Sequence, residues 1–408
     1  MAEAGPQNIS RSKRWITALL RVLGVALLGL VVWKVHWRDT IVLADGTEIA
    51  GEIVGPIPTR DGWEKGAEVE FRAADEAASA RYGRDALRIE KAKKGQPPVP
   101  DVNEGLIRIV RNSDKSLLLA GLVLYGFITQ IGVSRWWLLL RAQEIRLRYG
   151  LAHRLTFLGF FFNNVVPGPT GGDLVKAVYA AKLAAADKKA QAVVTVVIDR
   201  VVGIIALALI AAGVLLTKLD DPVYRELALF IGLFLGGVAL ASVLFFSRRL
   251  RTLIRFESWS AKLPGGGLIR KADEAVFLWR DHKRAVAVAL LLSFANQLSI
   301  QAMMLMFASA LHVTTQGGEA LAWSTYMAVL PVCFIVTALP LLPGGWGVRE
   351  AAFVYWFGLV GVERNPAIAL SVVNGMTGLF WSLLGGVYFL TDREAVRSAE
   401  SSAAESAS

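Results

Sequence analysis

Residues 164–176 read NVVPGPTGGDLVK, a stretch in which prolines and glycines interrupt the backbone before an acid and a base. The stretch follows closely on the apolar run LTFLGFFF, residues 155–162. A helix that breaks here leaves peptide N–H and C=O groups without helical partners. At membrane depth such backbone persists only where it is buried in protein or faces a watery cavity. The stretch therefore predicts a broken helix beside a cavity, provided that the surrounding chain lies in a membrane.

The composition indicates that this stretch lies in a membrane protein, because more than half of the 408 residues are hydrophobic. A helix needs roughly 20 apolar residues to cross a bilayer. We predict full spans at residues 16–35, 117–140, 191–216, 227–246, 285–311 and 367–390. The first is expected to be an uncleaved anchor rather than a signal peptide, since its end, VVWKVHW, lacks a cleavage pattern of small residues.

A second break, PLLPGGWGVRE at residues 340–350, has the same spacing as the first. In both, a proline is followed by three residues, a Gly-Gly pair, two residues, a valine and a cation. Three full spans separate the breaks, so hairpins built on them enter from opposite faces, as in many transporters with inverted repeats. The alternative is that each arm crosses the membrane as a short span. The predicted fold class is an all-α polytopic membrane protein with two re-entrant broken-helix hairpins, plus a small β-rich insert.

The charge distribution sets the expected topology and domains. The net charge is +10, but residues 36–114 carry 12 Lys/Arg against 15 Asp/Glu, so the basic excess lies in short loops beside apolar runs. Cytoplasmic loops have this pattern, and contact with anionic lipids is the alternative use of the excess. We expect no nucleic-acid partner. The predicted division is a cytoplasmic start and anchor (1–35), an extracytoplasmic domain (36–114), a multi-span domain (115–391) and a disordered tail (392–408).

The extracytoplasmic domain is predicted to be β-rich. The segment TIVLADGTEIAGEIVG places an Asp-Gly turn between two alternating strands. The segments EVEFRA, ALRIEKA and GLIRIVR are predicted to be further strands. An envelope partner is a possible ligand of this domain.

The motifs FFNNVVPGPTGGD, IDR at residues 198–200 and LPLLPGGWGVRE together resemble the lysylphosphatidylglycerol synthase transmembrane-domain family, which includes the flippase portion of the multiple peptide resistance factor. The resemblance covers residues 117–390. It implies a lipid-handling membrane domain. The β-rich insert departs from the usual pattern, and no aminoacyl-transferase domain follows the last span, so lysyl transfer to lipid is not expected.

The cations after the breaks are the first candidates for a site. Residues that follow each Gly-Gly pair are expected to start a half-helix, whose free amides and positive dipole end attract an anion. Lys176 and Arg349 lie within the first turn and add full charge, so a phosphate fits. The alternative is that the glycines permit tight helix packing and both cations reach out to headgroups.

Charged and amide side chains inside the apolar runs complete the candidate site. Asp199 and Arg200 lie well inside a span, where charge is functional or paired; we expect partners from the acids and bases near the breaks. The network either holds the two hairpins together or responds to substrate. The predicted lipid- or anion-binding residues are Asn163, Asn164, Gly171, Gly172, Asp173, Lys176, Asp199, Arg200, Gly344, Gly345, Arg349 and Glu350.

Other polar and aromatic residues are weaker candidates. Asn296 and Gln297 could line the cavity or form interhelical hydrogen bonds. Trp136 and Trp137, beside Arg135, are predicted to be interfacial anchors, and Arg135 to belong to a basic cluster at the cytoplasmic end of its span.

The sequence favours a lipid translocase over an enzyme. The four histidines are scattered, no metal site or cofactor is expected, and no catalytic motif appears. The predicted function is movement of an anionic phospholipid or polyprenyl-phosphate-linked lipid between leaflets of a prokaryotic inner membrane. The alternatives are a membrane enzyme, or its partner, in lipid or glycolipid modification, and an envelope scaffold.

Overall fold

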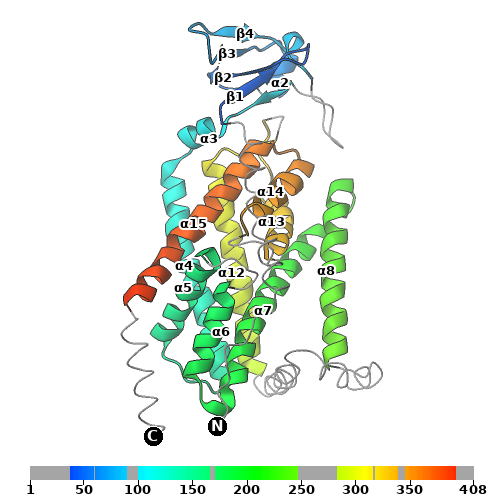
Figure 1. Cartoon of the computed structure of the whole chain (residues 1–408). Coiled ribbons are helices and arrows are strands. Elements are labelled where there is room, and N and C mark those ends of the chain that lie inside the picture. Colours follow the sequence, from blue (N-terminus) through cyan, green and yellow to red (C-terminus); the bar gives the residue numbers. More distant parts are fainter. Residues whose placement is uncertain are drawn as a thin grey trace, which may run out of the picture.

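The computed structural model describes residues 37–58, 60–89, 100–165, 171–246, 283–315, 318–338 and 345–391. A bundle of helices carries a small β-sheet at one end (Figure 1). The predicted first anchor, most of the basic loop after residue 247, Gly344 and the C-terminal tail lie outside the described residues.

Within the described residues, five helices are long and apolar enough to cross a membrane, and each matches a predicted span. They are α4 (Lys115–Ala142), α7 (Lys189–Leu215), α8 (Pro222–Phe246), α12 (Lys283–Ala310) and α15 (Arg364–Thr391). Large leucines such as Leu229 and Leu233 of α8 are exposed, as expected of helices whose outer face meets lipid. The protein is therefore a mostly helical, polytopic membrane protein, and the helices expected at these five positions are present.

Two pairs of shorter helices flank the two breaks. The first pair is α5 (Tyr149–Val165) with α6 (Gly171–Leu183), and the second is α13 (Trp323–Ala338) with α14 (Val348–Leu359). The helices of each pair pack against each other. That both pairs re-enter the membrane stays a prediction.

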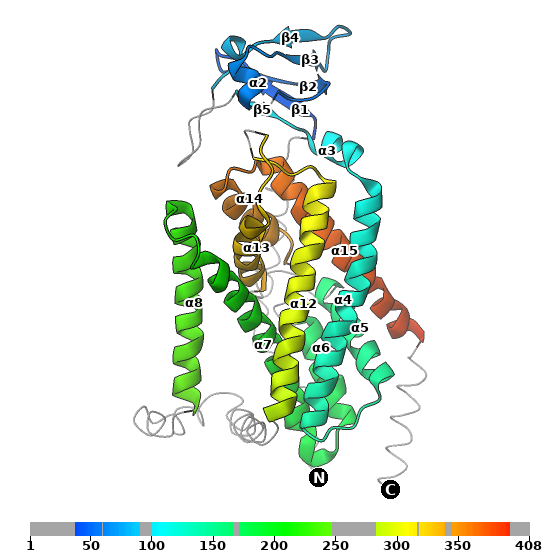
Figure 2. The same ribbon diagram turned by 180° about the vertical axis from the view of Figure 1, so that it is seen from behind.

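The interior of the bundle joins these elements into one body. Helices α4 and α12 lie side by side along the bundle (Figure 2). The main apolar cluster draws on α7, α12, α13, α14 and α15 and includes Phe307, Phe353 and Phe357. Helix α5 crosses α15 closely: a Cβ on Gly385 would lie 2.0 Å from the Phe157 carbonyl oxygen, so only glycine allows this approach.

The small domain is a five-stranded antiparallel sheet with the strand order β4-β3-β2-β1-β5. The strands are β1 (Asp39–Val42), β2 (Glu48–Val54), β3 (Val69–Ala73), β4 (Ala80–Tyr82) and β5 (Val102–Asn103), and a short helix α2 (Arg60–Glu64) lies between β2 and β3. Its core gathers Ile41, Ile53, Phe71 and Trp63. The predicted Asp-Gly turn joins β1 to β2, where the Asp45 side chain accepts the Thr47 N–H at 2.8 Å.

Two of the strand predictions need correction. The segment GLIRIVR is not a strand but forms helix α3 (Leu106–Asn112). Its arginines are three residues apart, so a helix places Arg108 and Arg111 on one face, which meets the sheet. Of the segment ALRIEKA, Leu87 and Ile89 form only isolated bridges, and residues 90–92 lie outside the described part. Strands β4 and β5 were not predicted.

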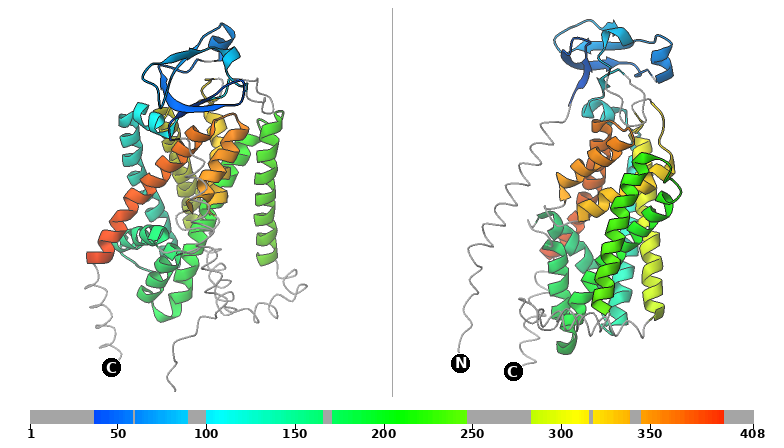
Figure 3. Two further views of the ribbon diagram at one scale, coloured as in Figure 1. Left: turned by 45° about the horizontal axis from the view of Figure 1, so that its top comes forward. Right: turned by 90° about the vertical axis from the view of Figure 1, so that its right-hand side faces the viewer.

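Helix α3 joins the sheet to the bundle, and the sheet lies beyond α3 in every view (Figure 3). The buried Asp39 carboxylate accepts the N–H groups of Ile53 and Gly105, at 2.8 and 2.7 Å. Arg108 donates to the Ile53 carbonyl oxygen at 2.6 Å, and Arg111 donates to Glu52 at 2.8 Å. Polar contacts therefore fasten α3 to β1 and β2.

Acid is expected to loosen this junction. The guanidinium groups of Arg111 and then Arg72 hold the pKa of the Glu52 carboxyl below its usual value. The stabilisation from Glu52 is thus fully present above the unfolded pKa of about 4.3 and is lost as the pH falls through the lower folded value. Hydrogen exchange in α3, corrected for the intrinsic rate, should be faster at a pH below the folded-state pKa of Glu52 than at neutral pH. The same acceleration in Glu52→Gln protein would contradict this assignment.

Candidate functional site

A cavity of about 350 Å³ lies inside the bundle, between α4, α5, α6, α7 and α12. Five of the predicted site residues line it: Asn163, Asp173, Lys176, Asp199 and Arg200. Asn296 and Gln297 of α12 also line it, and Gln297 donates to the Gly203 carbonyl oxygen at 2.9 Å. Residues on both sides of the first break and the charges inside the spans therefore meet at one place.

Asp199 of α7 is the centre of a buried charge cluster. Arg135 of α4 donates from Nε to Asp199 Oδ1 at 2.7 Å, and Lys176 Nζ of α6 lies 3.8 Å from Oδ2. Arg135 Nη1 also donates to Ser293 Oγ of α12, at 3.1 Å. A Cβ on Gly203 would lie 3.2 Å from Arg135 Nη1, so this glycine leaves room for the guanidinium. One carboxylate thus connects three helices.

The predictions for Arg135 and Trp136 were wrong. Arg135 is buried rather than part of a basic cluster at the end of the span. Trp136 is fully buried, donates from Nε1 to Thr195 Oγ1 at 3.2 Å, and carries the Lys176 ammonium 3.9 Å from its ring centroid. Both side chains face inward because α4 presents them to α6 and α7. Apolar residues on both sides of Arg135 in the sequence could have indicated a buried charge.

Arg200 connects the two helix pairs. It forms an ion pair with Asp173 in the first turn of α6 and donates from Nη2 to the Ala338 carbonyl oxygen, at the end of α13, at 2.8 Å. The side chains of this pair are partly exposed, whereas Lys176 is buried. Arg200 and Asp173 therefore form the accessible side of the cavity.

The two predicted asparagines support the backbone at the first break. Asn163 Oδ1 accepts the Gly172 N–H at 2.9 Å, and Asn164 donates to the Phe160 carbonyl oxygen of its own helix at 3.0 Å. A Cβ on Gly172 would lie 1.8 Å from the Gly159 carbonyl oxygen. Helices α5 and α6 therefore need glycine at position 172, as the packing interpretation of the motif expected. Gly171 is the first residue of α6.

The second break holds its charges differently. Arg349 and Glu350 are buried and form an ion pair at 2.7 Å, and Ser371 Oγ of α15 lies 3.1 Å from Arg349 Nε and 3.0 Å from Glu350 Oε1. Glu350 also accepts the Gly347 N–H at the start of α14. Neither residue is among those that line the central cavity. The Glu350 carboxylate thus occupies the start of α14, where the sequence predicted a bound anion.

Two glycines shape this second cluster. A Cβ on Gly375 of α15 would lie 2.1 Å from Arg349 Nη2, so the guanidinium occupies space that a side chain would fill. Gly345 has a φ of +69° and would clash with Thr337 if it carried a Cβ, at 2.6 Å.

The central cavity has an excess of positive charge. Its lining includes the three cations Arg135, Lys176 and Arg200 and the two carboxylates Asp173 and Asp199. One positive charge is therefore uncompensated within the lining, which favours an anion. Within the described ranges, no group of three or more His, Cys, Asp and Glu side chains could hold a metal ion.

Comparison with known proteins agrees with the predicted resemblance. The family described as the lysylphosphatidylglycerol synthase TM region matches residues 103–386. The chain is 26% identical to the UPF0104 membrane protein PH1989 of Pyrococcus horikoshii, over 323 residues that cover 71% of this chain and 91% of the relative. It is 22% identical to a UPF0104 membrane protein of Methanothermobacter thermautotrophicus, over 292 residues that cover 66% of this chain and 81% of that protein. Because the match extends over well more than half of the chain, the protein belongs to the lysylphosphatidylglycerol synthase transmembrane-region family.

Proposed function

We propose that the protein is a lipid translocase that moves an anionic phospholipid, or a polyprenyl-phosphate-linked lipid, between the leaflets of a prokaryotic inner membrane. The observation that carries the proposal is the cavity inside the bundle, where three cations face two carboxylates. The family's description, which names a lipid, supports it. In this proposal the β-rich domain faces away from the cytoplasm.

A phosphate in the cavity would meet cations of two kinds. Arg200 is accessible and shares its guanidinium with Asp173, so an incoming phosphate competes with that carboxylate for a bidentate partner. Lys176 is buried deeper, against Trp136 and Asp199. The headgroup therefore passes from Arg200 toward Lys176 while its acyl chains stay in lipid.

Removing the Lys176 charge is expected to slow this movement. A charged hydrogen bond is worth roughly 1.5–3 kcal/mol, so Lys176→Gln should slow translocation of anionic lipid about tenfold or more. Lys182→Gln, on the exposed side of the same helix, is the matched control. The measurement uses reconstituted vesicles with fluorescent phosphatidylglycerol or phosphatidylcholine, and chemical reduction of the outer leaflet. Unchanged phosphatidylglycerol movement in folded Lys176→Gln protein would reject the cavity as the site.

The same vesicles separate the other functions. A translocase changes only the sidedness of a lipid, whereas an enzyme produces a new lipid species that mass spectrometry detects. If wild-type protein moves no lipid and makes no new species, the translocase proposal fails in favour of a scaffold.

A further inference from the structure

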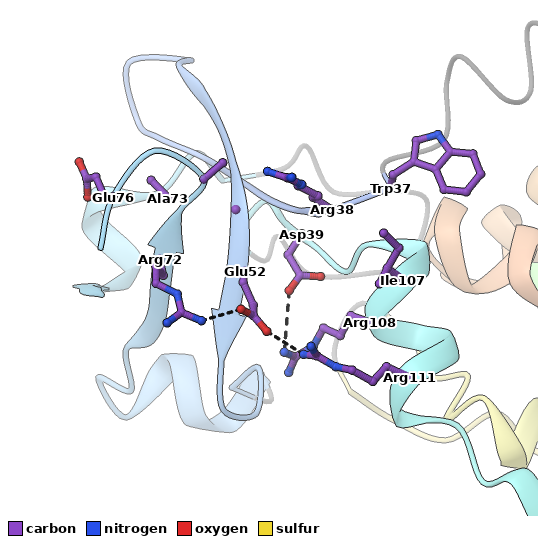
Figure 4. Close-up of a pocket in the computed structure, with 12 residues that line it drawn as sticks. Trp37, Arg38, Asp39, Glu52, Arg72, Ala73, Glu76, Ile107, Arg108 and Arg111 are labelled. Carbon is purple, nitrogen blue, oxygen red and sulfur yellow. Dashed lines mark hydrogen bonds and ion pairs between the residues drawn. The ribbon is translucent and has the colours of Figure 1, made fainter. Parts of the chain in front are cut away.

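A second cavity lies outside the spans, where the sheet meets α3. Its volume is about 310 Å³ (Figure 4). Most of its lining comes from residues 37–76, which precede the part that matches the family. The charged residues of the lining are Arg38, Asp39, Glu52, Arg72, Glu76, Arg108 and Arg111. This cavity is separate from the site inside the bundle.

Arg72 and Arg111 share one carboxylate in this cavity. They donate to the two oxygens of Glu52 at 2.6 and 2.8 Å (Figure 4). Their side chains remain 45% and 59% exposed. A guanidinium has five N–H donors, so each arginine can bind a further anion. The lining of a neighbouring cavity of about 500 Å³ also includes Glu52, Arg72 and Arg111, so this arginine pair is accessible from a second direction.

Some of the other charged residues hold the sheet to α3, and the rest belong to the accessible part of the cavity. The buried Asp39 and the partly buried Arg108 hold α3 to the sheet. The remaining lining carries Arg38, Arg72 and Arg111 against Glu52 and Glu76, an excess of one positive charge. The accessible part of the cavity therefore favours an anion with several acceptor oxygens.

Exposed apolar side chains lie at the same junction, close in the chain to the start of the apolar helix α4. Ile107 and Val110 of α3 are 57% and 50% exposed, and Trp37 is 50% exposed. Figure 4 shows Trp37 and Ile107 at one edge of the cavity and Arg72 at the other. Helix α3 ends at Asn112, and the apolar helix α4 begins at Lys115. A tryptophan and exposed aliphatic residues beside basic residues, next to the end of a span, are typical of the lipid interface.

We propose that this cavity binds the phosphate of an anionic phospholipid in the leaflet next to the β-rich domain. Arg72 and Arg111 hold the phosphate, which takes the place of the Glu52 carboxylate. Trp37 and Ile107, which line the cavity, contact the glycerol and the first methylenes of the acyl chains. The site needs no translocation and stands whether or not the central cavity moves lipid.

The first test is a photo-crosslinking measurement on the full-length protein in detergent, with photoactivatable phosphatidylglycerol and, in parallel, phosphatidylcholine. Phosphatidylglycerol is expected to label peptides from residues 37–54 and 103–112, and phosphatidylcholine to label them much less. Soluble glycerol 3-phosphate should compete only weakly, because it lacks acyl chains for the apolar rim. Full competition by glycerol 3-phosphate would assign the site to a soluble phosphate instead, and absence of label from both segments would reject it.

The second test separates lipid binding from a purely structural arginine cluster. Each arginine is expected to contribute about 1 kcal/mol, so Arg72→Gln and Arg111→Gln should each lower capture about fivefold. Arg81→Gln, an exposed arginine of the same domain, is the matched control. Glu52→Gln should raise capture, because it removes the carboxylate that competes with the phosphate. Exposed ion pairs contribute little to stability, so the domain stays folded. If Glu52→Gln lowers capture as the arginine variants do, the cluster only holds α3 to the sheet and the proposal is wrong.

Discussion

Asp199→Asn is expected to destabilise the protein by about 3–5 kcal/mol, the cost of removing one partner from a buried ion pair. The substitution leaves the buried cations Arg135 and Lys176 without the carboxylate that lies 2.7 and 3.8 Å from them. The amide oxygen of asparagine still accepts a hydrogen bond, so the loss measures charge. Thermal unfolding of the purified protein in detergent should show a large fall in the midpoint.

Three further variants test this prediction. Asp220→Asn removes an exposed carboxylate and should leave the midpoint unchanged. Adding Arg135→Gln to Asp199→Asn should recover part of the lost stability, since one unpaired cation disappears. An Asp199→Asn protein as stable as the Asp220→Asn control would contradict the charge cluster. A stable triple variant that also carries Lys176→Gln but moves no lipid would show that the cluster serves the substrate as well as the fold.

Arg349→Gln is expected to cause a loss of the same order, about 3–5 kcal/mol, but for a different reason. Here the residue left behind is the buried Glu350 carboxylate, whose remaining hydrogen-bond partners in the described part of the chain are Ser371 and the Gly347 N–H. Folded protein should therefore be lost before transport can be measured. By contrast, Lys176→Gln should leave folded protein with slow transport.

The control for Arg349 is Arg364→Gln, at the exposed start of α15. The double replacement Arg349→Met with Glu350→Leu removes both charges and should be far less damaging than either single change. If Arg349→Gln folds normally and slows anionic lipid as Lys176→Gln does, then both breaks serve the substrate and the distinction between them is wrong.

Local patterns were enough to predict the spans and the β-hairpin. A run of apolar residues needs no knowledge of its neighbours to indicate a helix that spans a membrane, and the Asp45-Gly46 turn specifies its own hairpin. Helix α3 was missed because the apolar and basic side chains of its seven residues fit both the two-residue repeat of a strand and the 3.6-residue repeat of a helix. The contacts of Arg108 and Arg111 with the sheet decide between them, and these contacts are tertiary.

The candidate site was predictable where charge stands out from apolar sequence. Asp199 and Arg200 stood out in this way. Of the partners expected for them near the breaks, Asp173 and Lys176 form ion pairs with them, whereas Arg349 and Glu350 pair with each other. Arg135 was missed because the direction in which a helix points its side chains depends on the helices around it. The internal repeat predicted equal roles for Lys176 and Arg349. An acid directly follows Arg349, and the nearest acid to Lys176 is three residues before it, so their partners differ.

The space that Gly375 leaves for the Arg349 guanidinium links two positions that lie on different helices. A relative that carries a side chain in place of Gly375 has no room for an arginine at position 349, and must replace it by a smaller residue. The carboxylate next to it then has no cation and should be exchanged as well. Positions 349, 350 and 375 should therefore change together in evolution, as a unit that drifts independently of the charged residues around the central cavity.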